Sequence, residues 1–246
     1  MEIPRNTEMI EAGQDVTIQL LGEASRPPDL MFIGSHCVGL DYLIGEMQKR
    51  GVSCRFLAVG SMGGVMAAKR GECDISGIHL LDEDSGMYNH HLLSPELHLH
   101  KGYRRSQGLI FRKDDENFAD CNTDFGKFFQ QVIINPEVHM INRNRGSGTR
   151  VLLDSYLENQ QPSGFFQEAK SHNSVAAAVA QKRADWGFAI RSVAEDSGLG
   201  FIPIQDEEYD FVIPKERLQR PEVARFLSLL EEKDIKKKLT ELGLKT

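Results

Sequence analysis

The chain has 246 residues, which is enough for one large domain or for two lobes with separate cores. Its 29 basic and 36 acidic residues give a net charge of −7, which argues against nucleic acid or an anionic membrane surface as a partner. No run of about 18 apolar residues occurs, so we expect no membrane-spanning helix. The start of the chain lacks a basic segment followed by an apolar one, and the four cysteines lack the paired spacing of metal sites. We therefore expect a cytoplasmic protein with reduced thiols.

The first third of the chain predicts a short β segment and then alternating strands and helices. Val16, Ile18 and Leu20 alternate with polar residues, which indicates a half-buried strand, and the Pro-containing stretch after it reads as a linker. The next elements are expected at 30–33 (strand), 38–50 (helix), 54–59 (strand), 64–70 (helix) and 73–79 (strand). This order predicts a parallel sheet with right-handed crossovers.

The polar segment 82–102 contains four of the eight histidines, namely His90, His91, His98 and His100. We expect a solvated loop there and no metal site, because metal ligands must converge from a fixed frame. Further elements are predicted at 105–111 (strand), 122–131 (helix), 140–142 (strand), 151–159 (helix), 174–180 (helix), 184–190 (strand), 201–204 (strand), 209–214 (strand), 221–230 (helix) and 235–242 (helix).

The element order repeats loosely, which predicts an α/β protein with two lobes. We expect a β segment with a linker over 1–29, lobe 1 over 30–105 plus 205–246, and lobe 2 over 106–204. In such folds the ligand lies in the crevice at the carboxyl ends of the strands.

Two glycine-rich loops, at 59–64 and 142–150, each follow a predicted strand and precede a predicted helix. A strand that turns through Gly and Ser into a helix directs free backbone N–H groups and the positive end of a helix dipole at one place. Two such loops predict one anion held from two sides. The alternative is that their serines only cap helices and that Arg143 and Arg145 are solvated charges.

Residues 30–230 resemble the periplasmic-binding-protein-like (type II) domain that is found fused to molybdopterin molybdotransferase or to helix-turn-helix regulators, and that is related to molybdate- and tungstate-binding proteins. The resemblance rests on six ordered blocks, at 34–36, 59–64, 71–82, 142–150, 175–179 and 209–214. It implies a two-lobed fold in which each lobe is a mainly parallel sheet flanked by helices. Residues 3–21 resemble the tail of the last β-domain of the molybdotransferase. The chain departs from the tungstate-binding relatives at Arg145, which replaces an acidic residue.

The loops and the resemblance together predict a set of ligand-binding residues contributed by both lobes. Small anions are recognised by groups that donate hydrogen bonds and accept none. Histidines at strand ends and Tyr209 complete the set, although Tyr209 could equally be core packing. The predicted residues are Ser35, His36, Ser61, Met62, Gly63, His79, Arg143, Arg145, Ser147, Gly148, Thr149, Ser174, Val175 and Tyr209.

The resemblance implies a cytosolic binding or sensor domain for molybdate, tungstate or a molybdopterin species that serves molybdenum cofactor biosynthesis, with a molybdotransferase-like domain as partner in cis or in trans. We expect no intrinsic cofactor. We also expect no catalytic residue, because Ser147 has no neighbouring base that could activate it as a nucleophile. Two alternatives remain open. One is a catalytic accessory domain for metal insertion into molybdopterin, and the other is an effector domain that responds to its ligand by lobe closure.

Overall fold

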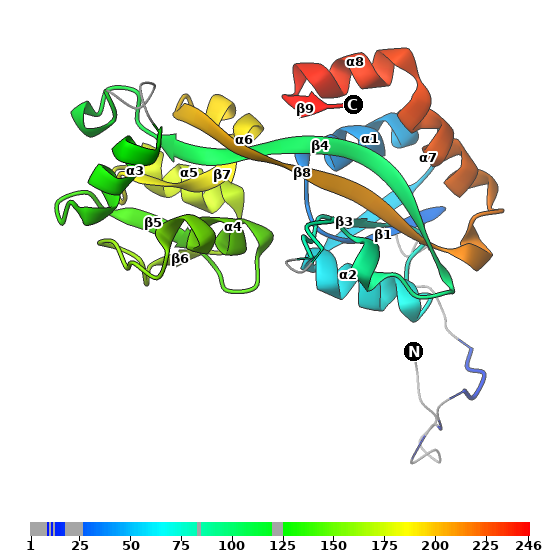
Figure 1. Ribbon diagram of the computed structural model, residues 1–246. Coiled ribbons are helices and arrows are strands. Elements are labelled where there is room, and N and C mark those ends of the chain that lie inside the picture. Colours follow the sequence, from blue (N-terminus) through cyan, green and yellow to red (C-terminus); the bar gives the residue numbers. More distant parts are fainter. Residues whose placement is uncertain (1–8, 10, 12, 18–26, 83–84, 120–124) are drawn as a thin grey trace.

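The computed structural model describes residues 9, 11, 13–17, 27–82, 85–119 and 125–246. These form two lobes that are joined by two long strands, as Figure 1 shows. The α/β class and the two-lobed arrangement expected from the sequence are confirmed. Among the helices of the described residues, none has both the length and the apolar character that a transmembrane span requires.

Lobe 1 contains a short parallel sheet with helices on both sides (Figure 1). Strands β1 and β2 pair in parallel with Leu30 opposite Cys54, and Phe32 forms a parallel bridge to Ile75 next to β3. The predicted parallel crossovers are therefore confirmed here. The elements are β1 (Leu30–Gly34), α1 (Val38–Lys49), β2 (Cys54–Ala58), α2 (Gly60–Lys69), β3 (Ser76–Ile78), α7 (Pro221–Glu231) and α8 (Lys233–Glu241).

Lobe 2 repeats this architecture with a second parallel group, in which β5 pairs with β6 on one side and with β7 on the other. Its elements are α3 (Phe125–Ile134), β5 (Met140–Arg143), α4 (Gly148–Leu157), β6 (Glu168–Ala169), α5 (His172–Ala180), β7 (Trp186–Ile190) and α6 (Arg191–Asp196). Helices α1 and α2 of lobe 1 and α4 and α5 of lobe 2 begin on the side of their lobe that faces the other lobe.

The connection between the lobes consists of β4 (Leu97–Phe111) and β8 (Gly200–Pro214), which pair antiparallel over almost their whole length and run through both lobes. In the described residues they belong to one sheet with the order β3-β8-β4-β7-β5-β6, and β9 (Leu244–Lys245) pairs with β4. Register shifts in β4 between His100 and Tyr103 and between Gln107 and Gly108 interrupt the ladder. Such irregularities bend a strand and redirect its side chains.

Each lobe has its own apolar core. In lobe 1, Phe32 on β1, Leu40 on α1 and Phe226 on α7 are fully buried and belong to one cluster. In lobe 2, Trp186 and Phe188 on β7 pack with Phe129 on α3. Burial of large apolar side chains on both sides of the connecting strands gives two bodies that can keep their shape if they move relative to one another.

Several predicted boundaries were wrong. Residues 97–102 belong to β4 and not to a loop, so His98 and His100 lie on a strand, and the strands predicted at 201–204 and 209–214 are the single strand β8. Helix α2 begins at Gly60 and not at Gly64, and α5 begins at His172 and not at Ser174.

The predicted N-terminal β segment is not a strand where the structure describes it. Residues 13–17 have no regular structure, and Val16 is exposed, so they have no sheet partner to bury their apolar side chains. Ile18 and Leu20 lie outside the described residues.

Candidate functional site

A cavity of about 620 Å³ lies between the two lobes and is lined by residues from both. Four helices of eight residues or more begin at its wall, namely α1 and α2 from lobe 1 and α4 and α5 from lobe 2. The first N–H groups of a helix have no partner within the helix, and the helix dipole makes that end positive. Four such ends around one cavity favour an anionic ligand.

The helix starts reach the cavity because each follows a strand through a short turn. Gly146 has a φ of 81°, a conformation that glycine adopts without strain, and it turns the chain from β5 toward α4. Ser147 and Ser171 then cap α4 and α5 by accepting hydrogen bonds from the backbone N–H groups of Arg150 and Ser174. These caps leave the N–H groups at the first positions of both helices directed at the cavity.

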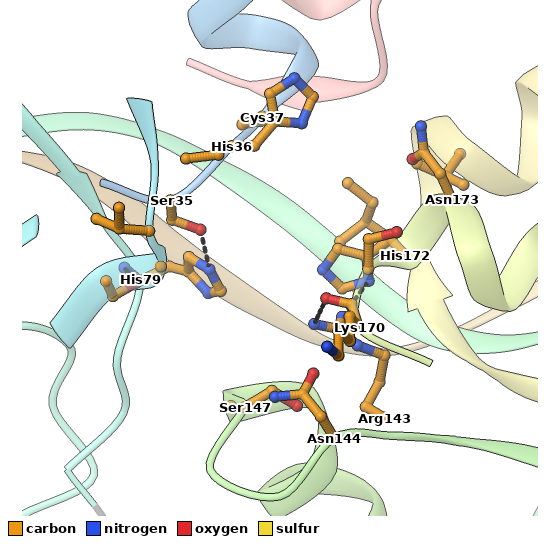
Figure 2. Close-up of a pocket in the computed structure, with 18 of the residues that line it drawn as sticks. Ser35, His36, Cys37, His79, Arg143, Asn144, Ser147, Lys170, His172 and Asn173 are labelled. Carbon is orange, nitrogen blue, oxygen red and sulfur yellow. Dashed lines mark hydrogen bonds between the residues drawn. The ribbon is translucent and has the colours of Figure 1, made fainter. Parts of the chain in front are cut away.

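Arg143 supplies a cationic side chain to the lobe 2 wall, as Figure 2 shows. It is the last residue of β5 and is 8% exposed. Its Nε donates to the carbonyl oxygen of Ala169 at 3.2 Å, and its Nη1 lies 3.2 Å from Nδ1 of His172. Burial lowers the pKa of Arg143 to about 10, so the guanidinium stays charged at neutral pH.

The Arg143 contact fixes the protonation of His172. Because a guanidinium only donates hydrogen bonds, Nδ1 of His172 must accept, and the proton of the neutral ring lies on Nε2. Burial, reinforced by the charge of Arg143, lowers the pKa of His172 well below its usual value, which agrees with a neutral ring. The other ring nitrogen faces the middle of the cavity (Figure 2), where its N–H can donate to a ligand.

The rim of the cavity carries charges of both signs. Lys170 lines it on the lobe 2 side, and Asp41 and Asp196 also line it. Asp41 Oδ2 lies 2.7 Å from Nε2 of His36, and this hydrogen bond raises the pKa of His36. A ligand that reaches the rim would therefore meet both hydrogen-bond donors and hydrogen-bond acceptors.

The lobe 1 wall contains a chain of hydrogen bonds that ends in the connecting strands. Oγ of Ser35 lies 2.8 Å from Nε2 of His79, and Nδ1 of His79 lies 3.1 Å from Oε2 of Glu207 on β8. Glu207 is fully buried, forms an ion pair with the equally buried Arg105, and accepts a hydrogen bond from Nε2 of Gln107 at 2.7 Å. Burial raises the pKa of Glu207, but the charge of Arg105 together with the interactions of His79 and His172 outweighs burial and lowers this pKa to about 2.

Eight of the fourteen residues predicted for the site line the cavity: Ser35, His36, Ser61, Met62, His79, Arg143, Ser147 and Gly148. The two lobes come close at this point, since a Cβ on Gly148 would lie 3.6 Å from the carbonyl oxygen of His79. Ser61 is inside α2 and not its cap, and its hydroxyl accepts a hydrogen bond from the backbone N–H of His79 at 3.2 Å.

The other six predicted residues are not part of the lining: Gly63, Arg145, Thr149, Ser174, Val175 and Tyr209. Arg145 is exposed at the tip of the turn after β5, and Ser174 is exposed on α5. Val175 is fully buried in the lobe 2 core, because α5 starts earlier than expected. Tyr209 is fully buried and donates to the carbonyl oxygen of Ser35 at 2.5 Å, so it supports the loop from behind.

Sequence reasoning missed the cavity residues Asn144, Lys170, Ser171, His172 and Asn173, together with the buried Arg105–Glu207 pair. The cap rule offers a signal for the first group, because Ser171 stands one position before an alanine-rich helix. For Arg105 and Glu207 the sequence offers no such signal, since they meet only through the pairing of β4 with β8. Among the described residues there is no group of three metal-ligating side chains.

A family model for the PBP superfamily domain matches residues 44–231, and the chain therefore belongs to this family. Over 194 residues the chain is 30% identical to the uncharacterized protein YvgK of Bacillus subtilis (strain 168), and the alignment covers 75% of this chain and 60% of YvgK. The matching region thus spans less than two thirds of that relative.

Two solved structures share the fold. A protein from Clostridium perfringens solved with bound phosphate has a TM-score of 0.64 and 17% identity, with 88% of this chain and 98% of that chain covered. An ABC-type phosphate transport receptor from Vibrio cholerae has a TM-score of 0.59 and 15% identity, with 88% and 99% covered. The chain is therefore a member of the PBP superfamily with the periplasmic-binding-protein type II fold.

Proposed function

We propose that this protein binds an anion in the cavity between its lobes and acts as a receptor or sensor domain for that anion. The observation that carries this proposal is the convergence of four helix N-termini and the Arg143 guanidinium on one cavity. Donors of this kind recognise oxyanions, phosphate groups and carboxylates without a metal. The phosphate named for the two structural neighbours is a ligand of the same chemical class.

For the ligand itself we propose molybdate, tungstate or a phosphate-bearing molybdopterin species, with the pterin favoured by the size of the cavity. The cavity of 620 Å³ corresponds to roughly 20 water molecules at about 30 Å³ each, far more than a five-atom oxyanion fills. It lies within the range of about 300–1,000 Å³ that is typical of sites for larger organic ligands. Arg143 and Lys170 would meet the phosphate, and the donors and acceptors at the rim would meet the polar ring edges.

The wider role follows from this ligand. We propose a cytosolic domain that serves molybdenum cofactor biosynthesis together with a molybdotransferase-like domain in cis or in trans. Closure of the lobes around the ligand, by bending of β4 and β8, would signal occupancy to that partner. The register shifts that flank Tyr103–Gln107 of β4 support a hinge there, because they interrupt the regular ladder.

A second candidate function is acyl transfer, and the Ser35–His79–Glu207 chain favours it. A hydroxyl, an imidazole and a carboxylate in hydrogen-bonded order are the parts of an activated serine nucleophile. Oγ of Ser35 would attack an ester carbonyl, His79 would take the hydroxyl proton and give it to the leaving alcohol, and water would release the acyl group. Arg105 already neutralises Glu207, which weakens its support for a charged imidazole, so we rank binding first.

A thermal-shift screen tests the proposed function and ranks its ligands. Molybdate, tungstate, phosphate and sulfate are compared at equal ionic strength, and a ligand at 100 times its Kd adds about 2.7 kcal/mol to the unfolding free energy. For a chain of this size, that free energy raises the Tm by roughly 5–11 °C. A shift with any of these anions supports the anion site. The same Tm with all of them, and with a pterin phosphate, would refute it.

Covalent labelling of Ser35 distinguishes acyl transfer from anion binding. A fluorophosphonate probe should leave Ser35 unmodified if the chain only binds its ligand. Covalent modification of Ser35 that disappears in His79→Gln would favour catalysis.

A further inference from the structure

The hydrogen-bond chain from Ser35 to Glu207 fixes where its protons lie. Glu207 is an acceptor only, because Arg105 keeps it ionised, so Nδ1 of His79 must donate to it. A neutral imidazole has one N–H, and Nε2 of His79 must then be an acceptor. The only proton between Nε2 and Oγ of Ser35, at 2.8 Å, is the hydroxyl proton of Ser35, which therefore points at His79 and is not free for a ligand.

This arrangement conflicts with the binding of a fully ionised anion. With its proton donated to His79, the oxygen of Ser35 can only accept a hydrogen bond from a ligand. The oxygens of a fully ionised oxyanion are also acceptors only, so the two would repel each other. Protonation of His79 reverses the direction of the hydrogen bond between His79 and Ser35. Nε2 would then donate to Oγ of Ser35, and the hydroxyl proton of Ser35 would become free to point at the ligand.

We propose that this site takes up one proton, on His79, when it binds a fully ionised oxyanion, and that it takes up less when the anion carries its own hydrogen. This inference rests on the proposed function. It makes the Ser35–His79 pair a determinant of specificity, because a hydrogen phosphate or a protonated monoester can donate to Oγ of Ser35 directly, whereas molybdate or tungstate cannot.

The groups that face His79 make its charge responsive to an anion. Glu207 and the ring of Tyr209 approach it from β8, with the two rings stacked at 6.0 Å between centroids. Burial lowers the pKa of His79, and the positive charges of Arg105 on β4 and Arg143 on β5 lower it further, while Glu207 opposes them.

His172 on α5 also faces His79, and burial together with the charge of Arg143 lowers the pKa of His172 and favours its neutral ring. The lowered pKa of His79 favours a neutral ring before an anion binds. An anion bound against Arg143 and Ser35 offsets the positive charge of Arg143 and raises the pKa of His79. Because the coupling between the two sites is reciprocal, the proton also strengthens the binding of the anion.

Titration calorimetry in buffers of different ionisation enthalpy measures the proton uptake directly. For molybdate at about neutral pH we expect an uptake approaching one proton per anion, and for phosphate an uptake smaller by at least about half a proton. The affinity for molybdate should fall by up to about tenfold per pH unit over the range in which uptake is complete. Both measurements use the unmodified chain and do not depend on any variant folding.

Variants assign the proton to a residue. His79→Gln should abolish the uptake, because an amide does not titrate. His139→Gln, a matched change at a half-exposed histidine outside the cavity lining, should preserve it. His36→Gln removes the other titratable ring of the lobe 1 wall and should also leave most of the uptake in place.

The outcomes separate the inference from the function on which it rests. Binding of molybdate without proton uptake, uptake that survives His79→Gln, or uptake that disappears with His36→Gln would overturn the inference and leave the anion site standing. If neither molybdate nor phosphate gives any binding heat or thermal shift, the proposed function falls for these anions, and the proton uptake falls with it.

Discussion

Replacing Arg143 is the sharpest perturbation of the proposed anion site. Its guanidinium is buried in the cavity wall and is oriented by Ala169 and His172, so a bound anion gains a charge-assisted hydrogen bond from a side chain that is already held in place. Losing a hydrogen bond to a charged group costs about 1.5–3 kcal/mol. Arg143→Ala should therefore weaken anion binding by about 10- to 150-fold.

Arg145→Ala is the matched control for this experiment. It removes the same charge two residues away on the same loop, but from an exposed side chain outside the lining. We expect less than about a threefold change, because exposed charges are screened by salt. Arg143→Lys should lie between the two, since it keeps the charge but loses the planar set of donors.

The assay is titration calorimetry with the anion that gives the largest thermal shift, after urea denaturation has verified that each variant folds. A loss in Arg145→Ala as large as the loss in Arg143→Ala would refute the reasoning. Binding would then depend on the general charge of the loop and not on a group built into the cavity wall.

The remaining predictions concern stability. Glu207→Ala leaves the Arg105 guanidinium buried without its carboxylate, so the unfolding free energy should fall by about 3–5 kcal/mol in urea denaturation; a loss below about 1 kcal/mol would contradict the buried pair. In Gly77→Ala the new Cβ would lie 2.0 Å from the hydroxyl oxygen of Tyr209, and the resulting displacement should cost about 1–3 kcal/mol, while an unchanged Tm would show that the contact is not tight. The folded protein disfavours protonation of His172, whereas the unfolded chain takes up that proton below about pH 6.5. Stability should therefore fall as the pH drops from 7 to about 5, and His172→Gln should flatten that slope; an equal slope in wild type and variant would count against it.

The sequence predicted the two walls of the cavity better than it predicted their connection. Gly34-Ser35, the 59–64 loop and Gly146-Ser147-Gly148 are local strand-to-helix turns, and local chemistry of Gly and Ser determines such turns. Parallel pairing followed from the alternation of strands and helices, and it is observed for β1 with β2 and for β5 with β6 and β7. The domain boundaries at 29/30, 105/106 and 204/205 remain predictions.

What the sequence could not predict depends on contacts between distant segments. Strand β4 extends into a polar, histidine-containing stretch because it pairs with β8 as far as Leu97 opposite Pro214, and local composition does not reveal such a distant partner. Arg143 and Arg145 look equivalent in the loop sequence. The end of β5 between them buries the first and leaves the second on the surface. Near Ser147 the sequence shows no base, whereas the structure places His79, directly after β3, beside Ser35, directly after β1.

The most direct test of the central claim, that an anion binds between the lobes, is the position of a heavy oxyanion in a crystal. Crystals grown with tungstate and measured at the tungsten absorption edge should show their strongest anomalous peak inside the cavity, between the N-termini of α1, α2 and α4 and within hydrogen-bond distance of Arg143. Tungsten peaks confined to the outer surface, with the cavity free of any peak while the anion stabilises the protein in solution, would contradict the account.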